Sequence, residues 1–189
     1  SYVMARMLFE KAVAQGDPNA MFDLAILYRD GQGVGQSYQK TAELFTMAAE
    51  KGDVKAMFGL GCLYRDGQGV VQSFKKAVEI FTMAAEKGHA TAMLGLGNMY
   101  RDGRGVVQSF KKAVELFTMA AEQGDVNAMT RLGVHYIQGQ GVAQSNELAR
   151  EWWTKAADEG DEDAIKNLKI LDEEEGKPTT ASRPSSICC

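Results

Sequence analysis

The stretch SYQKTAELFTMAAEKGDVKAMFGLGCLYRDGQGVVQ, residues 37–72, recurs almost whole at residues 73–108 and again at residues 109–144. The first two copies are identical at 24 of 36 positions, so the recurrence is not accidental. A glycine also falls every 36 residues, at Gly16, Gly52, Gly88, Gly124 and Gly160. A fixed period of this length indicates stacked helical units, each of which covers the apolar face of the next. We therefore predict an all-α, α/α solenoid of 36-residue helix-turn-helix repeats.

Length, composition and charge bound the class of protein. The 189 residues are 45% hydrophobic, which suffices for one domain of stacked units with a sizeable buried core. The formal net charge of −4 lacks the basic excess that draws proteins to nucleic acid, so we expect no nucleic-acid partner. Two of the three cysteines end the chain, so no disulfide framework can join the repeats. We expect a cytoplasmic protein, because no apolar run is long enough to span a bilayer either.

Each repeat is predicted to contain two helices, which we call the A and B helices. The A helix begins after an aspartate cap, as at Asp17, and ends at an Arg-Asp-Gly sequence near Asp30. A Gly-x-Gly-Val connector leads to a serine, as at Ser37, that caps the B helix. One column of the A helices holds small residues, where we expect the backbone of another helix to approach: Ala25, Gly61, Gly97 and Gly133. One column of the B helices holds methionines, which we expect to fill the core or a groove, with an adaptable binding surface as the alternative: Met47, Met83 and Met119.

The register of the repeat divides the chain into four predicted parts. Residues 1–16 are the second helix of a truncated repeat, and residues 17–160 are four complete repeats. Residues 161–175 form a C-terminal capping helix, and the polar residues 176–189 form a disordered tail. The start in mid-repeat indicates the C-terminal part of a longer protein. The capping helix has Lys169 and Asp172 where other A helices have a small residue and a tyrosine, so we expect a polar outer face.

Three motifs closely resemble the Sel1-like repeat, an α/α solenoid related to the tetratricopeptide repeat. They are Ala-x-x-x-Leu-Gly-x-x-Tyr at 56–64, Gly-x-Gly-Val at 67–70 and Ala-x-x-Trp-Trp-x-Lys-Ala-Ala-x-x-Gly at 149–160. The resemblance covers about residues 2–171 and implies a right-handed superhelix that serves as an adaptor or scaffold for other proteins. It implies no reaction. We expect no enzyme and no cofactor.

Motifs that could carry chemistry have simpler structural interpretations. Ser-x-x-Lys, as at Ser37 and Lys40, has the spacing of a serine nucleophile and its lysine, but it recurs at a helix cap without the accompanying motifs of such enzymes. His89 and His135 lack cysteines or carboxylates at ligand spacing, so we expect surface histidines and no metal site.

The copies differ most in four columns of the A helix, at offsets of 0, 3, 4 and 7 that share one helix face. We predict that this face is concave and binds a protein or peptide partner; free drift of a solvent-exposed row is the alternative. The columns are Asn19, Lys55, Thr91 and Asn127; Phe22, Phe58, Leu94 and Thr130; Asp23, Gly59, Gly95 and Arg131; and Ile26, Cys62, Asn98 and Val134.

The chain ends in Cys188 and Cys189, which resemble the doubly prenylated end of small vesicle-traffic GTPases. Membrane association is expected only if these cysteines carry lipid. The sequence thus predicts a monomeric interaction scaffold. The alternatives are the non-catalytic repeat region of a larger enzyme, such as a kinase-like or ubiquitin-ligase-associated protein, and a repeat-borne hydrolase.

Overall fold

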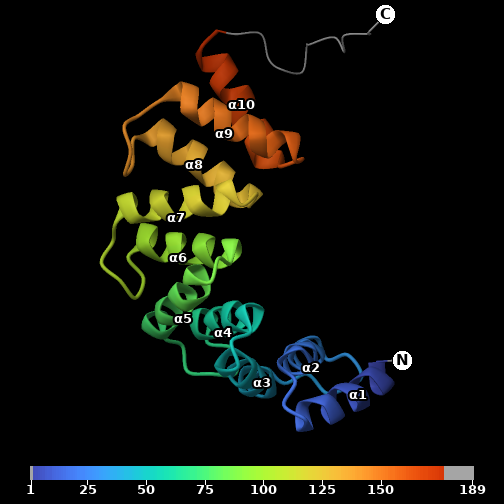
Figure 1. The fold of residues 1–189 in the computed structure, drawn as a ribbon. Coiled ribbons are helices and arrows are strands. Elements are labelled where there is room, and N and C mark those ends of the chain that lie inside the picture. Colours follow the sequence, from blue (N-terminus) through green and yellow to red (C-terminus); the bar gives the residue numbers. More distant parts are fainter. Residues whose placement is uncertain (1, 177–189) are drawn as a thin grey trace, which may run out of the picture. The chain divides into compact units, whose positions relative to one another are not determined.

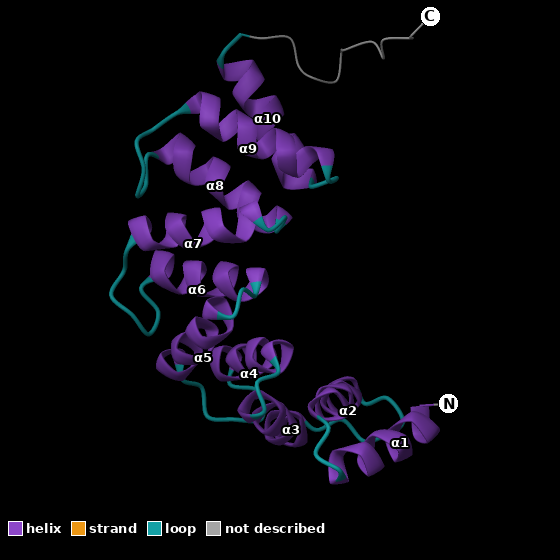
Figure 2. Ribbon diagram, in the orientation of Figure 1, coloured by secondary structure: helices purple, strands orange, loops and turns teal. Residues whose placement is uncertain are grey.

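The structure, a computed structural model, describes residues 2–176. These residues form ten α-helices and no strand, joined by short turns (Figures 1 and 2). The helices are α1 (Tyr2–Ala14), α2 (Pro18–Asp30), α3 (Tyr38–Glu50), α4 (Val54–Asp66), α5 (Phe74–Glu86), α6 (Ala90–Asp102), α7 (Phe110–Glu122), α8 (Val126–Gln138), α9 (Asn146–Asp158) and α10 (Glu162–Glu174). Even-numbered helices are the A helices and odd-numbered helices the B helices. The predicted all-α solenoid of helix-turn-helix repeats is confirmed.

The described residues divide into two compact units, one that ends at Ser109 and contains α1 to α6, and one that begins at Phe110 and contains α7 to α10. Between residues 2 and 176, no helix has both the length and the apolar character needed to cross a membrane. Each unit is built from A and B helices that pack on their neighbours in the chain.

Side-chain caps start the helices at the residues that the repeat predicts. The Asp53 carboxylate accepts a hydrogen bond from the Ala56 N–H at 2.7 Å, and the Ser37 hydroxyl accepts one from the Lys40 N–H at 3.3 Å. These bonds satisfy N–H groups that a helix start otherwise leaves without a partner. Gly67 ends α4 in the left-handed conformation, with φ 70°, and its N–H bonds to the Leu63 carbonyl at 2.8 Å.

The core of the first unit contains aliphatic side chains and one buried aromatic ring from each of α3 and α5, which packs against the A helices on both sides. Phe45 of α3 is 2% exposed, and Phe81 of α5 is fully buried. The connector valines Val34 and Val70 pack against this core.

The small-residue column of the A helices has a different cause from the one that we expected. A Cβ on Gly61 would lie 2.6 Å from the Phe81 ring, and one on Gly133 would overlap the Trp153 indole. The column therefore accommodates an aromatic ring of the following B helix, and not the backbone of another helix.

Close backbone approach occurs instead in the connectors. The second connector glycine, Gly69, has φ 70°, and a Cβ there would overlap the carbonyl of Tyr38 at the start of the preceding B helix. Gly105 lies in the same way against Phe74. By contrast, a Cβ on Gly52 or Gly88, in the turns before the A helices, would meet nothing within 4 Å.

We expect Gly61→Ala and Gly95→Ala to change stability in opposite directions. Alanine is favoured over glycine in a helix by about 1 kcal/mol, and at Gly95 the added Cβ would lie an ordinary 3.5 Å from Phe81. At Gly61 the same methyl group would strike the buried ring, and overpacking of this kind costs about 1–3 kcal/mol. Urea unfolding followed by circular dichroism should show a stabilised Gly95→Ala and a destabilised Gly61→Ala. Equal effects in both variants would contradict the assignment of the column to the ring.

Three further expectations about burial are wrong in whole or in part. Met47, Met83 and Met119 do not fill the core, since they are between 42% and 50% exposed, although Met47 does line a groove beside Gly69 and Val70. His135 is buried, and its Nδ1 lies 2.9 Å from the Gln140 carbonyl oxygen. Asp172 does not contribute to a polar outer face of the last helix, because it is 2% exposed.

Asp172 is buried because it is paired with Arg150 of α9. One guanidinium nitrogen of Arg150 bonds to Asp172 and another bonds to Glu175 at 2.8 Å. Asn146 also donates a hydrogen bond to Glu175 at 3.1 Å. The charged residues of the last A helix thus hold it onto α9, while Leu168 and Leu171 of α10 are buried beside Trp153.

Candidate functional site

In the first unit, six of the predicted partner-binding residues line one pocket between α2 and α4. It has a volume of about 430 Å³ and also includes Arg29, Leu63, Gln68 and His89, with Phe45 of α3. The six predicted residues are Phe22, Ile26, Lys55, Phe58, Gly59 and Cys62. We call this cavity the α2/α4 pocket.

Aromatic packing shapes the α2/α4 pocket. The ring of Phe22 is stacked on that of Phe45, with centroids 5.6 Å apart. Phe58 packs on Phe81 at 5.8 Å and is stacked on the imidazole of His89 at 5.1 Å. A Cβ on Gly59 would lie 2.6 Å from the Phe45 ring, so glycine at this position lets the aromatic ring reach the pocket.

Four ionisable side chains line the α2/α4 pocket. Two of them, Cys62 and His89, favour their neutral forms, and the charged pair, Arg29 and Lys55, is basic. Burial raises the pKa of the Cys62 thiol, so this group is protonated near neutral pH. Burial lowers the pKa of His89 most, and the positive charge of Lys55 lowers it further, so the neutral imidazole is favoured. Arg29 forms a two-point ion pair with Asp30, through Nε at 2.7 Å and Nη2 at 3.0 Å.

His89 should make the stability of the first unit acid-sensitive. Its Nδ1 accepts the Ala92 N–H at 3.2 Å, replacing the aspartate cap used elsewhere, and protonation removes that acceptor. Because folding lowers the pKa of His89, its contribution is present above the unfolded-state value of about 6.5 and is lost as pH falls toward the folded-state value. We expect this contribution to the free energy of unfolding to be about 0.5–1 kcal/mol, as for other helix caps. The free energy of unfolding, measured from about pH 8 to about pH 5, should fall in the wild type and should fall less in His89→Asp. Identical slopes would contradict the cap.

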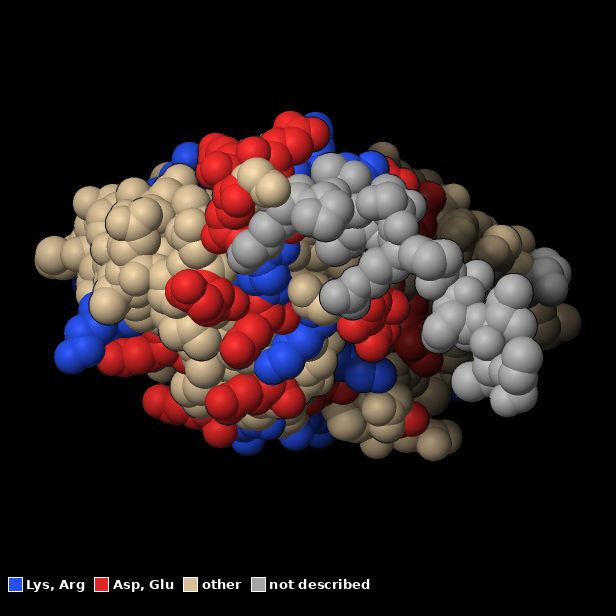
Figure 3. Space-filling model, turned by 90° about the horizontal axis from the view of Figure 1, so that it is seen from above, with Lys and Arg blue, Asp and Glu red and all other residues tan. Residues whose placement is uncertain are grey.

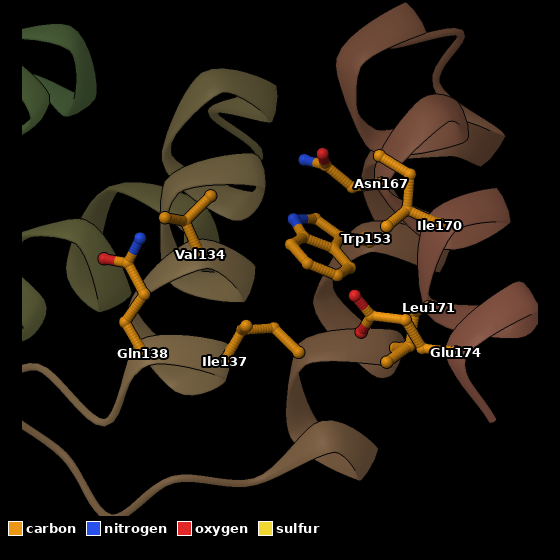
Figure 4. A pocket seen from close by; sticks show the side chains of 8 residues that line it. All are labelled: Val134, Ile137, Gln138, Trp153, Asn167, Ile170, Leu171 and Glu174. Carbon is orange, nitrogen blue, oxygen red and sulfur yellow. The ribbon is translucent and has the colours of Figure 1, made fainter.

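The second unit has two adjoining pockets between α8 and α10. The first, of about 260 Å³, is shown in Figure 4, where Trp153 lies between side chains of α8 and side chains of α10. The second, of about 330 Å³, has a polar lining. Its predicted residues come from α8: Asn127, Thr130, Arg131 and Val134. Trp153 Nε1 donates a hydrogen bond to the Thr130 carbonyl at 3.0 Å, which fixes the indole between the two A helices.

The opposite wall of this polar pocket was missed by the sequence analysis. It is formed by Asp163, Lys166, Asn167 and Ile170 of α10. Each of them stands 36 residues after a member of the four variable columns of α8. The 36-residue spacing therefore points to these residues. Because α10 is interpreted as a capping helix, the predicted columns stop at α8, one helix too early.

The remaining predicted residues do not line these pockets. They are Asn19, Asp23, Thr91, Leu94, Gly95 and Asn98. Leu94 is 9% exposed, so it belongs to the core of the first unit and not to an open surface. Asn19, Asp23 and Thr91 are exposed. Their exposure is compatible with contact to a partner and equally with unconstrained sequence variation at a solvent-exposed row.

The Ser-x-x-Lys motifs form no catalytic pair where the structure shows their side chains. Ser37 and Ser73 accept the backbone N–H of Lys40 and Lys76 as caps. The ammonium groups of these lysines lie over tyrosine rings, Lys40 at 4.8 Å from the Tyr28 centroid and Lys76 at 5.0 Å from that of Tyr64. Within residues 2–176, histidine, cysteine and carboxylate side chains form no cluster of three that could hold a metal ion.

On the face of the molecule seen in Figure 3, acidic and basic side chains are interspersed. The last helix, α10, carries five acidic and two basic residues. Cys188 and Cys189, the predicted lipidation sites, lie outside the described residues.

Comparisons with known proteins agree on one family. The family model described as the Sel1 repeat matches residues 1–17, 18–53, 54–89, 90–125 and 126–161. No curated protein matches the chain. Among solved structures, a Sel1 repeat protein from Oxalobacter formigenes is similar, with a TM-score of 0.88 and 30% identity over 97% of this chain and 75% of that one.

Two further solved structures share the fold. A protective antigen present in uropathogenic Escherichia coli strains, which displays an SLR fold, has a TM-score of 0.88 and 31% identity over 90% of this chain. The chain spans 36% of the length of that antigen. Cysteine rich protein B of Helicobacter pylori has a TM-score of 0.57 and 25% identity over 71% of this chain and 99% of its own. Because the family model matches almost the whole helical region and these folds agree, the chain belongs to the Sel1 repeat family.

Proposed function

We propose that this chain is a protein-interaction scaffold that binds a peptide segment of a protein partner across the variable face of its A helices. Sel1 repeat proteins are generally protein-interaction scaffolds, and the family is generally non-catalytic. The binding surface and the peptide nature of the ligand are the parts proposed for this chain.

One observation carries the proposal: in both units, columns at which the repeats differ line pockets between successive A helices. Drift of a solvent-exposed row explains variation, but it does not explain why varied residues surround cavities. Phe22, Phe58 and Val134 are half-buried apolar residues at these cavities, and such sites favour binding of apolar groups. The exposed column that contains Lys55 then supplies the polar rim of each site.

Photo-crosslinking tests the proposal without disturbing the core. A benzoyl-phenylalanine would be placed at Lys55, Asn127 or Lys166, which are exposed or line the pockets on A helices. Matched controls carry it at Lys75, Lys111 or Glu151, which are exposed on B helices. In the cells that make the protein, we expect crosslinks to one partner from the A positions only. Crosslinks only from the B positions would contradict the proposed surface.

We further propose a monomeric, cytoplasmic protein with no need of a cofactor, associated with membranes only if Cys188 and Cys189 carry lipid. Two acyl or prenyl chains would anchor a protein stably, whereas one would bind reversibly. The intact mass of the protein from its own cells tests the lipid. A mass equal to that of the polypeptide alone would contradict it.

A further inference from the structure

The α2/α4 pocket differs in charge from the chain as a whole. Two of its lining residues, Arg29 and Lys55, are basic and none is acidic. The whole chain, by contrast, has 25 acidic and 21 basic residues. Because Arg29 is paired with Asp30, this local difference in charge comes from Lys55.

Lys55 is the cation best placed to meet a ligand. It is exposed, it lines the pocket, and it forms no ion pair within residues 2–176. The Arg29 guanidinium is already held by Asp30. A carboxylate near Lys55 would thus gain a favourable interaction without breaking an existing ion pair.

The interior of the pocket suits a bulky apolar group. Its walls are the side chains of Phe22, Ile26, Phe58 and the protonated Cys62, with the Phe45 ring between the two A helices. The volume of about 430 Å³ falls in the range of roughly 300–1,000 Å³ found for small-ligand sites. Aromatic walls of this kind favour an aromatic or branched aliphatic side chain.

We infer that the α2/α4 pocket is the anchor site for an acidic peptide, taking a bulky apolar side chain between its aromatic walls and a neighbouring carboxylate beside Lys55. This inference rests on the proposed function, since it specifies the ligand of one part of that surface. A peptide with a basic residue beside the anchor is the disfavoured occupant, because Lys55 would repel it.

The test begins with random peptides displayed on phage and selected on the whole chain. We expect an enriched pattern of one bulky apolar residue with aspartate or glutamate within two positions of it. Amide chemical shifts of the labelled protein with the selected peptide should change in α2 and α4. Replacing the peptide's apolar residue by alanine should weaken binding about thirtyfold, as at an interface hot spot.

Charge reversal then isolates the role of Lys55. Fluorescence polarisation with the selected peptide should show about three- to tenfold weaker binding to Lys55→Glu, and the difference should shrink as salt is raised. The matched control is Lys75→Glu, which makes the same change of charge at an exposed position of α5 outside the pocket and should bind as the wild type does.

The possible outcomes separate the two proposals. If selected peptides shift amides of the A helices but carry basic neighbours, or bind Lys55→Glu unchanged, this inference is wrong and the scaffold proposal stands. If they shift only amides of the B helices, or if no peptide is enriched, the outcome counts against both.

Discussion

Arg150→Leu is expected to lower the free energy of unfolding of the second unit by about 3 kcal/mol. The substitution leaves the carboxylate of Asp172, which is 2% exposed, without the guanidinium that bonds to it. Removing one partner of a buried ion pair costs about 3–5 kcal/mol, because the remaining charge stays out of water. The lower end applies here, since the Arg150 side chain is itself 26% exposed and water can reach the site in part.

Tryptophan fluorescence can measure this change during urea unfolding. Both tryptophans of the chain, Trp152 and Trp153, lie in α9, so the signal reports on the second unit. The double variant with Arg150 and Asp172 both replaced by leucine is the control, and it should recover part of the stability because the buried Asp172 carboxylate is gone, although Glu175 still loses its bond to Arg150. If the single variant were as stable as the wild type, the pair would not hold α10 onto α9.

Phe81→Ala is expected to destabilise the first unit by about 3–5 kcal/mol. The ring is fully buried, packs on Phe58 at 5.8 Å and faces Gly61, so its removal leaves a cavity as well as lost apolar burial. Circular dichroism during urea unfolding measures the change. Met83→Ala, two residues away on the same helix and 50% exposed, is the matched control and should lie within about 0.5 kcal/mol of the wild type.

A double-mutant cycle sharpens the same prediction. In the Phe81→Ala background the ring that Gly61→Ala would strike is gone, so alanine at this position should become stabilising through its helix propensity. A Gly61→Ala that destabilises equally in both backgrounds would show that something other than the Phe81 ring requires the glycine.

The helices and their caps could be predicted because they depend on residues close together in the chain. Asp53 caps a backbone N–H three residues away, and Gly67 closes α4 through Leu63, so each signal is complete within one repeat. The period then transfers that prediction to the other copies. Sequence reasoning also found the variable face of α2, α4 and α8, because differences between copies can be compared column by column.

The errors concern contacts between segments that the repeat does not specify. Small residues at Gly61 and Gly133 signal that something lies close, but not whether it is a backbone or an aromatic ring. The burial of Asp172 depends on Arg150, 22 residues earlier and on a different helix. Met47 is hydrophobic, yet its exposure follows from which side of α3 meets α2 and α4, and composition alone cannot supply that.

The two kinds of turn differ in how much new sequence they can accept. A connector glycine such as Gly69 lies against the backbone of Tyr38, so a longer connector would push the following B helix out of register. Gly52 and Gly88, before the A helices, face open space. Inserted loops, tags or whole domains should therefore be accommodated at the turns before the A helices and not at the connectors. Within each unit, insertions are therefore expected only at the turns before the A helices, while the connectors keep the spacing of the repeats.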